Sequence, residues 1–182
     1  MDGKKYTVDY ERHISLAYPP SEPVFKGTVA LDGDKDGAKH DVVIKFTSTY
    51  CEAAHRKLAE VRWAPSLRFC ERVESVGMYV VVMDYYGGDS GKPFGDKEHI
   101  EQLREAVKTL HDADYVHGNL QEPNILVTAE GVKIVGFDWC GKAGVARYPA
   151  DILGQHAGVR YGDPITKDHD ERMFKLLTGS PY

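Results

Sequence analysis

The 182-residue sequence has no apolar run close to the ~18 residues that a membrane-spanning helix needs. It also lacks an apolar stretch near its start, where residues 1–13 are mostly charged or polar, so we expect no secretion signal. Cysteine is scarce: Cys51, Cys70 and Cys140 are an odd, scattered set without a C-x-x-C pair. Such cysteines are typical of free thiols in a reducing compartment and argue against a zinc site. These absences predict an intracellular protein, cytoplasmic or nuclear.

The sequence also has no excess of basic residues. Its 28 acidic and 23 basic side chains give a formal net charge of −5. Because nucleic acids and anionic membranes attract clustered positive charge, we expect neither as a partner. The hydrophobic fraction of 42% and the charged fraction of 28% are those of an ordinary globular protein. The length predicts one domain, or one unit made of two small lobes.

Strand-like and helix-like segments follow one another in a definite order. After an arm with one edge strand at residues 1–24, the pattern predicts strands at 24–31, 40–46, 68–74, 78–83, 124–127 and 132–137. Helical periodicity predicts helices at 50–61, 99–112 and 166–177. The glycine-rich end of the window 81–95 is a predicted linker. The first half is therefore β-rich with one helix, and the second half is mainly helical.

Three separated segments resemble the protein-kinase signature motifs, in the same order. Val42–Lys45 resembles V-A-I-K, whose lysine reaches nucleotide phosphates and pairs with a helix glutamate. For Lys45 the favoured partner is Glu52, while Glu60 at the helix end is interpreted as a solvated residue. Residues 110–127 resemble the catalytic loop H-R-D-L-x-x-x-N, and residues 132–141 occupy the place of the D-F-G strand and turn.

The resemblance assigns further positions to a kinase-like site. His117, Leu120 and Asn124 match the catalytic loop in spacing, and we expect His117 to serve in packing and hydrogen bonding more than as a general base. In the segment 82–88, Met83 stands at the gatekeeper position, and the backbone groups of Tyr85 and Tyr86 could contact an adenine. Near the end of the chain, Asp168 and Asp170 either cap the last helix or bond the catalytic-loop backbone.

The run from residue 42 to residue 149 is most similar to a group of fungal protein-kinase-like proteins. Their motifs read roughly H-G-D-L-R-x-x-N-I-L and I-D-F-D-W-A-G-K-x-G-x-A-R-Y-P, and residues 137–149 follow the second pattern closely. The resemblance implies an α+β, two-lobed protein-kinase-like fold with a β-rich N-lobe and a minimal, mainly helical C-lobe. The N-lobe would span residues 1–84, the hinge 85–91 and the C-lobe 92–182.

The sequence departs from this pattern where phosphoryl transfer needs carboxylates. Asn119 stands at the catalytic-base position, and a carboxamide cannot accept the proton of an acceptor hydroxyl. Gly136 stands in place of the metal-binding Asp of D-F-G, which leaves Asn124 and Asp138 as candidate metal ligands. The region before residue 29 has no G-x-G-x-x-G loop to hold phosphates. We therefore expect binding of ATP and Mg²⁺ to be weak or absent.

These departures favour a pseudokinase, which is a regulatory or protein-binding module on a kinase scaffold. The expected partner is another protein. One alternative is a slow or atypical ATP-dependent phosphotransferase that uses Lys45, Asn124 and Asp138. A second alternative is a purely structural domain that binds no nucleotide.

Overall fold

The computed structural model describes residues 6–14, 23–31, 39–87, 96–150, 152 and 158–182. The chain divides into two compact units. The first unit comprises Met1–Thr49 and Ser66–Tyr85, and the second comprises Tyr50–Pro65 and Tyr86–Tyr182. Each unit has a hydrophobic core of its own. In the described part of the chain, no helix has both the length and the apolar character needed to cross a membrane.

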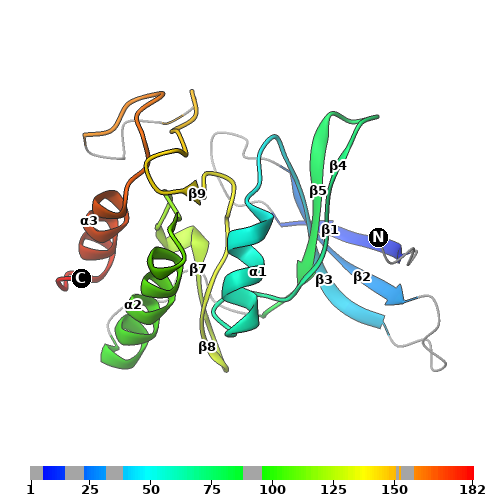
Figure 1. The fold of residues 1–182 in the computed structure, drawn as a ribbon. Coiled ribbons are helices and arrows are strands. Elements are labelled where there is room, and N and C mark those ends of the chain that lie inside the picture. Colours follow the sequence, from blue (N-terminus) through cyan, green and yellow to red (C-terminus); the bar gives the residue numbers. More distant parts are fainter. Residues whose placement is uncertain (1–5, 15–22, 32–38, 88–95, 151, 153–157) are drawn as a thin grey trace. The chain divides into compact units, whose positions relative to one another are not determined.

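The first unit is a five-stranded antiparallel sheet (Figure 1). Its strands are β1 (Tyr6–His13), β2 (Val24–Leu31), β3 (Lys39–Thr47), β4 (Leu67–Val73) and β5 (Met78–Asp84), in the order β1-β2-β3-β5-β4. Alternating β-branched residues bury one face of these strands. Val29, Val42, Ile44 and Val82 form the core of that face. The four strands predicted in this half of the sequence are present, and β1 is the edge strand that the arm was expected to contain.

The described residues of the second unit form three helices and two short antiparallel pairs of strands. The helices are α1 (Glu52–Glu60), α2 (Lys97–Asp112) and α3 (Lys167–Thr178), close to the ranges predicted from the sequence. Strand β6 (Tyr115–Val116) pairs with β9 (Gly141–Lys142), and β7 (Ile125–Thr128) pairs with β8 (Gly131–Ile134). A 3₁₀ turn, η1 (Glu122–Asn124), leads into β7. The side chain of Asp96 caps α2 by accepting a hydrogen bond from the backbone N–H of Glu98.

Helix α1 belongs to the second unit because of what it buries. Ala54 and Leu58 are fully buried and share one core with Leu103 of α2 and with Phe137. The sequence analysis placed α1 within the N-lobe of residues 1–84, whereas its packing assigns it to the second unit. The predicted hinge begins at Tyr85, the last residue of the first unit, and its residues 88–91 lie outside the described part.

A neutral histidine is built into the core of the second unit. His55 of α1 is fully buried and stacks on the ring of Phe137, with ring centroids 4.6 Å apart. One ring nitrogen lies 2.7 Å from the hydroxyl of Tyr50 and the other 2.8 Å from the carbonyl oxygen of Pro65. Since a carbonyl can only accept, Nε2 carries the proton and Nδ1 accepts from Tyr50. Burial lowers the pKa of His55 to about 4, because the charged imidazolium loses its hydration.

This histidine should make the protein less stable in mild acid. Its pKa lies below the unfolded value of 6.5, so the unfolded chain binds more protons between pH 6.5 and pH 4. The stabilisation is complete above pH 6.5 and is lost as the pH falls through that window. We expect the free energy of unfolding, measured by urea denaturation, to fall by about 1–2 kcal/mol more between pH 7 and pH 5 in wild type than in H55Q. An equal fall in the free energy of unfolding in both proteins would contradict the lowered pKa of His55.

Candidate functional site

The segment from His117 to Asn124, which the sequence analysis matched to a catalytic loop, is held in place by a buried carboxylate. Asp170 of α3 is fully buried. One of its oxygens accepts from the backbone N–H of His117 at 2.7 Å, and the other accepts from that of Gly118 at 2.8 Å. Of the two roles considered for Asp168 and Asp170, Asp170 therefore takes the second and bonds the loop backbone. His111 of α2 adds a third contact to this carboxylate, 3.2 Å from Nε2 to Oδ2.

His117 is enclosed at the start of this segment. Its side chain is fully buried, and its Nδ1 accepts a hydrogen bond from the backbone N–H of Asn119 at 3.2 Å. Its Nε2 lies 3.0 Å from the carbonyl oxygen of Val135, to which it donates. Both ring nitrogens are thus used within the protein. A general base needs a nitrogen that reaches the substrate, so this geometry suits a packing and hydrogen-bonding role.

A carboxamide, Asn119, occupies the predicted base position, where phosphoryl transfer needs a carboxylate. Asn119, at the base position, accepts a hydrogen bond through Oδ1 from the side-chain amide of Gln121 at 2.8 Å. Asn124 donates from Nδ2 to the backbone carbonyl of Asn119 at 2.9 Å. Asn119, Gln121 and Asn124, which we call the carboxamide cluster, are therefore linked to one another. The cluster holds the loop together, and none of its side chains can take up a proton at neutral pH.

Gly136 adjoins the carboxamide cluster and leaves little room for a side chain. It lies in the left-handed region at φ +78°, where residues with a Cβ are strained. A Cβ placed on Gly136 would lie 2.3 Å from Oδ1 and 2.6 Å from Cγ of Asn124. The Asn124 carboxamide therefore occupies the space that a side chain at position 136 would need. Asp138, two residues further, lies half-buried on the loop between β8 and β9.

The remaining predicted residues are divided between the two units. Lys45 is half-buried on β3, where it pairs with Val81 of β5, and Met83 is buried on β5. Glu52 lies in the first turn of α1, in the second unit, and its carboxylate accepts from Nε of Arg56 at 2.7 Å. The ion pair predicted between Lys45 and Glu52 joins residues of different units and stays a prediction.

The two tyrosines of the predicted hinge also fall in different units. Tyr85 closes the first unit, and its backbone N–H donates to the carbonyl oxygen of Asp41 at 3.0 Å. The backbone N–H of Tyr85 is therefore used within the sheet. Of the backbone groups of Tyr85, only the carbonyl oxygen remains for the predicted contact with an adenine. Tyr86 belongs to the second unit, where its ring lies under the ammonium group of Lys133 at 5.1 Å.

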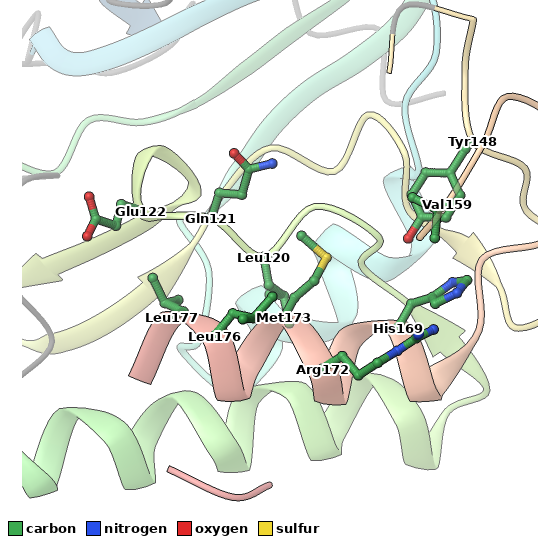
Figure 2. Close-up of a pocket in the computed structure, with 10 residues that line it drawn as sticks. All are labelled: Leu120, Gln121, Glu122, Tyr148, Val159, His169, Arg172, Met173, Leu176 and Leu177. Atoms are coloured by element: carbon green, nitrogen blue, oxygen red, sulfur yellow. The ribbon is translucent and has the colours of Figure 1, made fainter. Parts of the chain in front are cut away.

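A pocket beside the catalytic-loop-like segment was not predicted from the sequence. It has a volume of about 290 Å³ and lies between that segment and α3. Figure 2 shows Gln121 and Glu122 at one end and Tyr148 and Val159 at the other. The lining residues are Leu120, Gln121, Glu122, Tyr148, Val159, His169, Arg172, Met173, Leu176 and Leu177. These residues come from separate segments of the chain, around positions 120, 148, 159 and 169–177. Local sequence patterns therefore give no signal that their side chains meet.

Comparison with known proteins identifies the fold. No protein-family model matches the chain, and no curated protein matches it. Among solved structures, the kinase PK-1 of Cydia pomonella granulovirus is similar, with a TM-score of 0.67 and 14% sequence identity over 96% of this chain and 69% of that one. The chain has a protein-kinase-like fold. The predicted α+β kinase-like class is thereby confirmed, and at this identity the likeness concerns the fold alone.

A kinase-like fold implies ATP and Mg²⁺, and the described residues do not fit a magnesium site of the usual kinase kind. Magnesium prefers oxygen ligands and is held in kinases by the D-F-G carboxylate and the loop asparagine. Gly136 has no side chain, so of the two usual ligands only the side-chain oxygen of Asn124 is present, while its Nδ2 donates to Asn119. Within residues 96–150 and the other described ranges, no three His, Cys, Asp or Glu side chains gather as a metal-binding group.

Proposed function

We propose that the chain is a pseudokinase, a kinase-like protein that acts by binding another protein and does not transfer phosphoryl groups efficiently. The observation that carries this proposal is the packing of Asn124 against Gly136. The position that should supply the main metal carboxylate has no side chain, and its space is filled by the carboxamide of a neighbouring residue. Without that carboxylate, little remains to neutralise the charge that develops on the phosphates.

The catalytic-base position supports the same proposal. Asn119 cannot accept a proton, and its Oδ1 is already engaged with the amide of Gln121. Phosphoryl transfer depends almost wholly on positioning and electrostatic stabilisation. The loss of both groups should therefore lower the rate by several powers of ten, to a level at which a signalling kinase would be ineffective.

A kinase-like fold that has lost its chemistry can still present surfaces to a partner. The pocket between α3 and the catalytic-loop-like segment combines apolar walls with the charged side chains of Glu122 and Arg172 at its edge. Leu176 of α3 is 76% exposed there, so the apolar wall of the pocket reaches solvent. Apolar centres with polar rims are typical of protein-binding surfaces. We propose that the partner is a protein, and not a nucleic acid or a membrane.

The test is a thermal-shift measurement with millimolar ATP, with and without Mg²⁺, combined with transfer of labelled γ-phosphate to a general acceptor such as casein. We expect the melting temperature to rise by less than about 2 °C, since a ligand at or below its Kd stabilises by about 0.4 kcal/mol or less. We also expect no transfer above background. K45A is the matched control, because transfer that survives in K45A comes from a contaminating kinase.

One result would overturn the proposal, and another would extend it. A clear thermal shift together with transfer that K45A abolishes would replace the pseudokinase with a slow phosphotransferase. A shift without transfer would leave the pseudokinase in place and add nucleotide binding to it.

A further inference from the structure

Helix α3 has apolar side chains on two sides, and only one side is covered by the second unit. Phe174 is fully buried, and Met173 and Leu177 are half-buried against the core. Leu176 lines the same pocket as Met173 and Leu177, yet 76% of it is exposed, the largest exposure among the big hydrophobic side chains that the structure describes. The apolar wall of the pocket therefore continues onto the outer surface of the helix. Such a continuous apolar surface gains free energy when a second molecule covers it.

The two ends of this apolar wall carry opposite charges. Figure 2 shows Glu122 of η1 toward the Leu177 end of α3, whereas Arg172 lies nearer the start of that helix. Arg172 precedes Leu176 by four residues, so the two share one side of the helix. Glu122 and Arg172 are both exposed, and neither forms an ion pair with any other described residue. Both charges are thus available to a molecule that covers the pocket.

This arrangement is complementary to itself. A twofold rotation about an axis near Leu176 exchanges the two ends of the wall. It places Glu122 of one copy opposite Arg172 of the other, and by symmetry it makes that contact twice. The same rotation sets the two Leu176 side chains against each other. An unrelated protein would need its own matching pattern of charges, whereas a second copy of this chain has the pattern already.

We propose that this surface is the interface of a symmetric dimer of the chain. The surface, which we call the α3 face, has an apolar centre and two charged ends and consists of Leu120, Met173, Leu176, Leu177, Glu122 and Arg172. The inference rests on the proposed function, in which the pocket binds a protein, and it names that protein as a second copy. Because the face comprises few side chains, we expect a weak dimer that exchanges with monomer at micromolar concentrations.

The test is sedimentation velocity of the full chain over concentrations from about 1 to about 300 μM, which bracket a micromolar Kd. The mean mass of wild type should rise from that of one chain to that of two and stop there, because a twofold contact closes on itself. L176E should lower the association constant at least about tenfold, since it places carboxylates at the apolar centre. The matched control is V145E: Val145 is 71% exposed but does not line the pocket, so this variant should dimerise like wild type.

Charge reversal tests the symmetry of the contact. E122R and R172E each put like charges together at both ends, so each should weaken association at least about fivefold. The double variant E122R/R172E exchanges the two charges and should restore association to within about twofold of wild type, because opposite charges face each other again. Melting temperatures of the dilute, monomeric variants show whether each one keeps the fold.

Three results would overturn the dimer. Wild type could stay monomeric at every concentration, V145E could weaken association as strongly as L176E, or the double reversal could fail to restore it. None of these results bears on the loss of phosphoryl transfer, which the measurements with ATP and labelled phosphate decide separately.

Discussion

D170A should lower the free energy of unfolding by about 3–5 kcal/mol. The Asp170 carboxylate is fully buried and accepts hydrogen bonds from the backbone N–H groups of His117 and Gly118. Alanine would leave both donors buried without a partner, and His111 would lose its contact with the carboxylate. Each buried donor without a partner costs about 1–3 kcal/mol. For a chain of this length, the melting temperature should fall by roughly 6–20 °C.

The matched control for this experiment is D168A. Asp168 lies in the same first turn of α3, but its side chain is exposed. It contributes only the favourable interaction of a negative charge with a helix N-terminus, so its removal should cost less than about 1 kcal/mol. Urea denaturation of both variants measures the difference. A loss of under about 1 kcal/mol in D170A would show that Asp170 is not what holds the catalytic-loop-like segment.

G136A should lower the free energy of unfolding by about 2–3 kcal/mol. Alanine at φ +78° carries a backbone strain of about 1–2 kcal/mol. In addition, its Cβ would lie 2.3 Å from Oδ1 of Asn124, so the Asn124 side chain must rotate away. That rotation breaks the hydrogen bond to the carbonyl oxygen of Asn119, at a cost of about 1 kcal/mol. Chemical denaturation at neutral pH measures the total.

Two controls separate the strain from the clash. Gly144 has a similar φ of +72°, but a Cβ there would meet no atom within 4 Å. G144A should therefore cost only the backbone strain of about 1–2 kcal/mol. In the double variant N124A/G136A the clash is removed, so its cost should be smaller than the sum of the two single costs by about 1 kcal/mol. Additive costs would show that Asn124 does not fill the space at Gly136.

The packing of Asn124 against Gly136 also affects how easily substitutions could place carboxylates at the two predicted catalytic positions. N119D returns a carboxylate to the base position, while G136D must displace the Asn124 carboxamide and bear the left-handed backbone. The two positions differ in the structure, because the side chain of Asn124 fills the space that a side chain at position 136 would need.

Local sequence patterns were sufficient for the longer elements of this fold, while the two-residue strands β6 and β9 were not predicted. Alternation of β-branched residues predicts β2, β3 and β5, and the stripe Ile100, Leu103, Val107 and Leu110 predicts α2, because these patterns follow the repeat of the backbone itself. The catalytic-loop-like segment from His117 to Asn124 was predicted from its resemblance to the kinase motif, which involves only residues that lie close together in the chain. These features require no knowledge of distant contacts.

By itself, the sequence predicted the order of the main elements and the kinase-like fold, and it has no carboxylate at Asn119 or Gly136, the positions that the resemblance matches to catalytic carboxylates. Only the tertiary structure decided that α1 packs with the second unit, that Asp170 holds the loop, and that Asn124 occupies the space beside Gly136. The physical reason is that each of these contacts joins side chains from separate elements. Their meeting depends on how the buried faces pack, and the pattern within one segment carries no information on that packing.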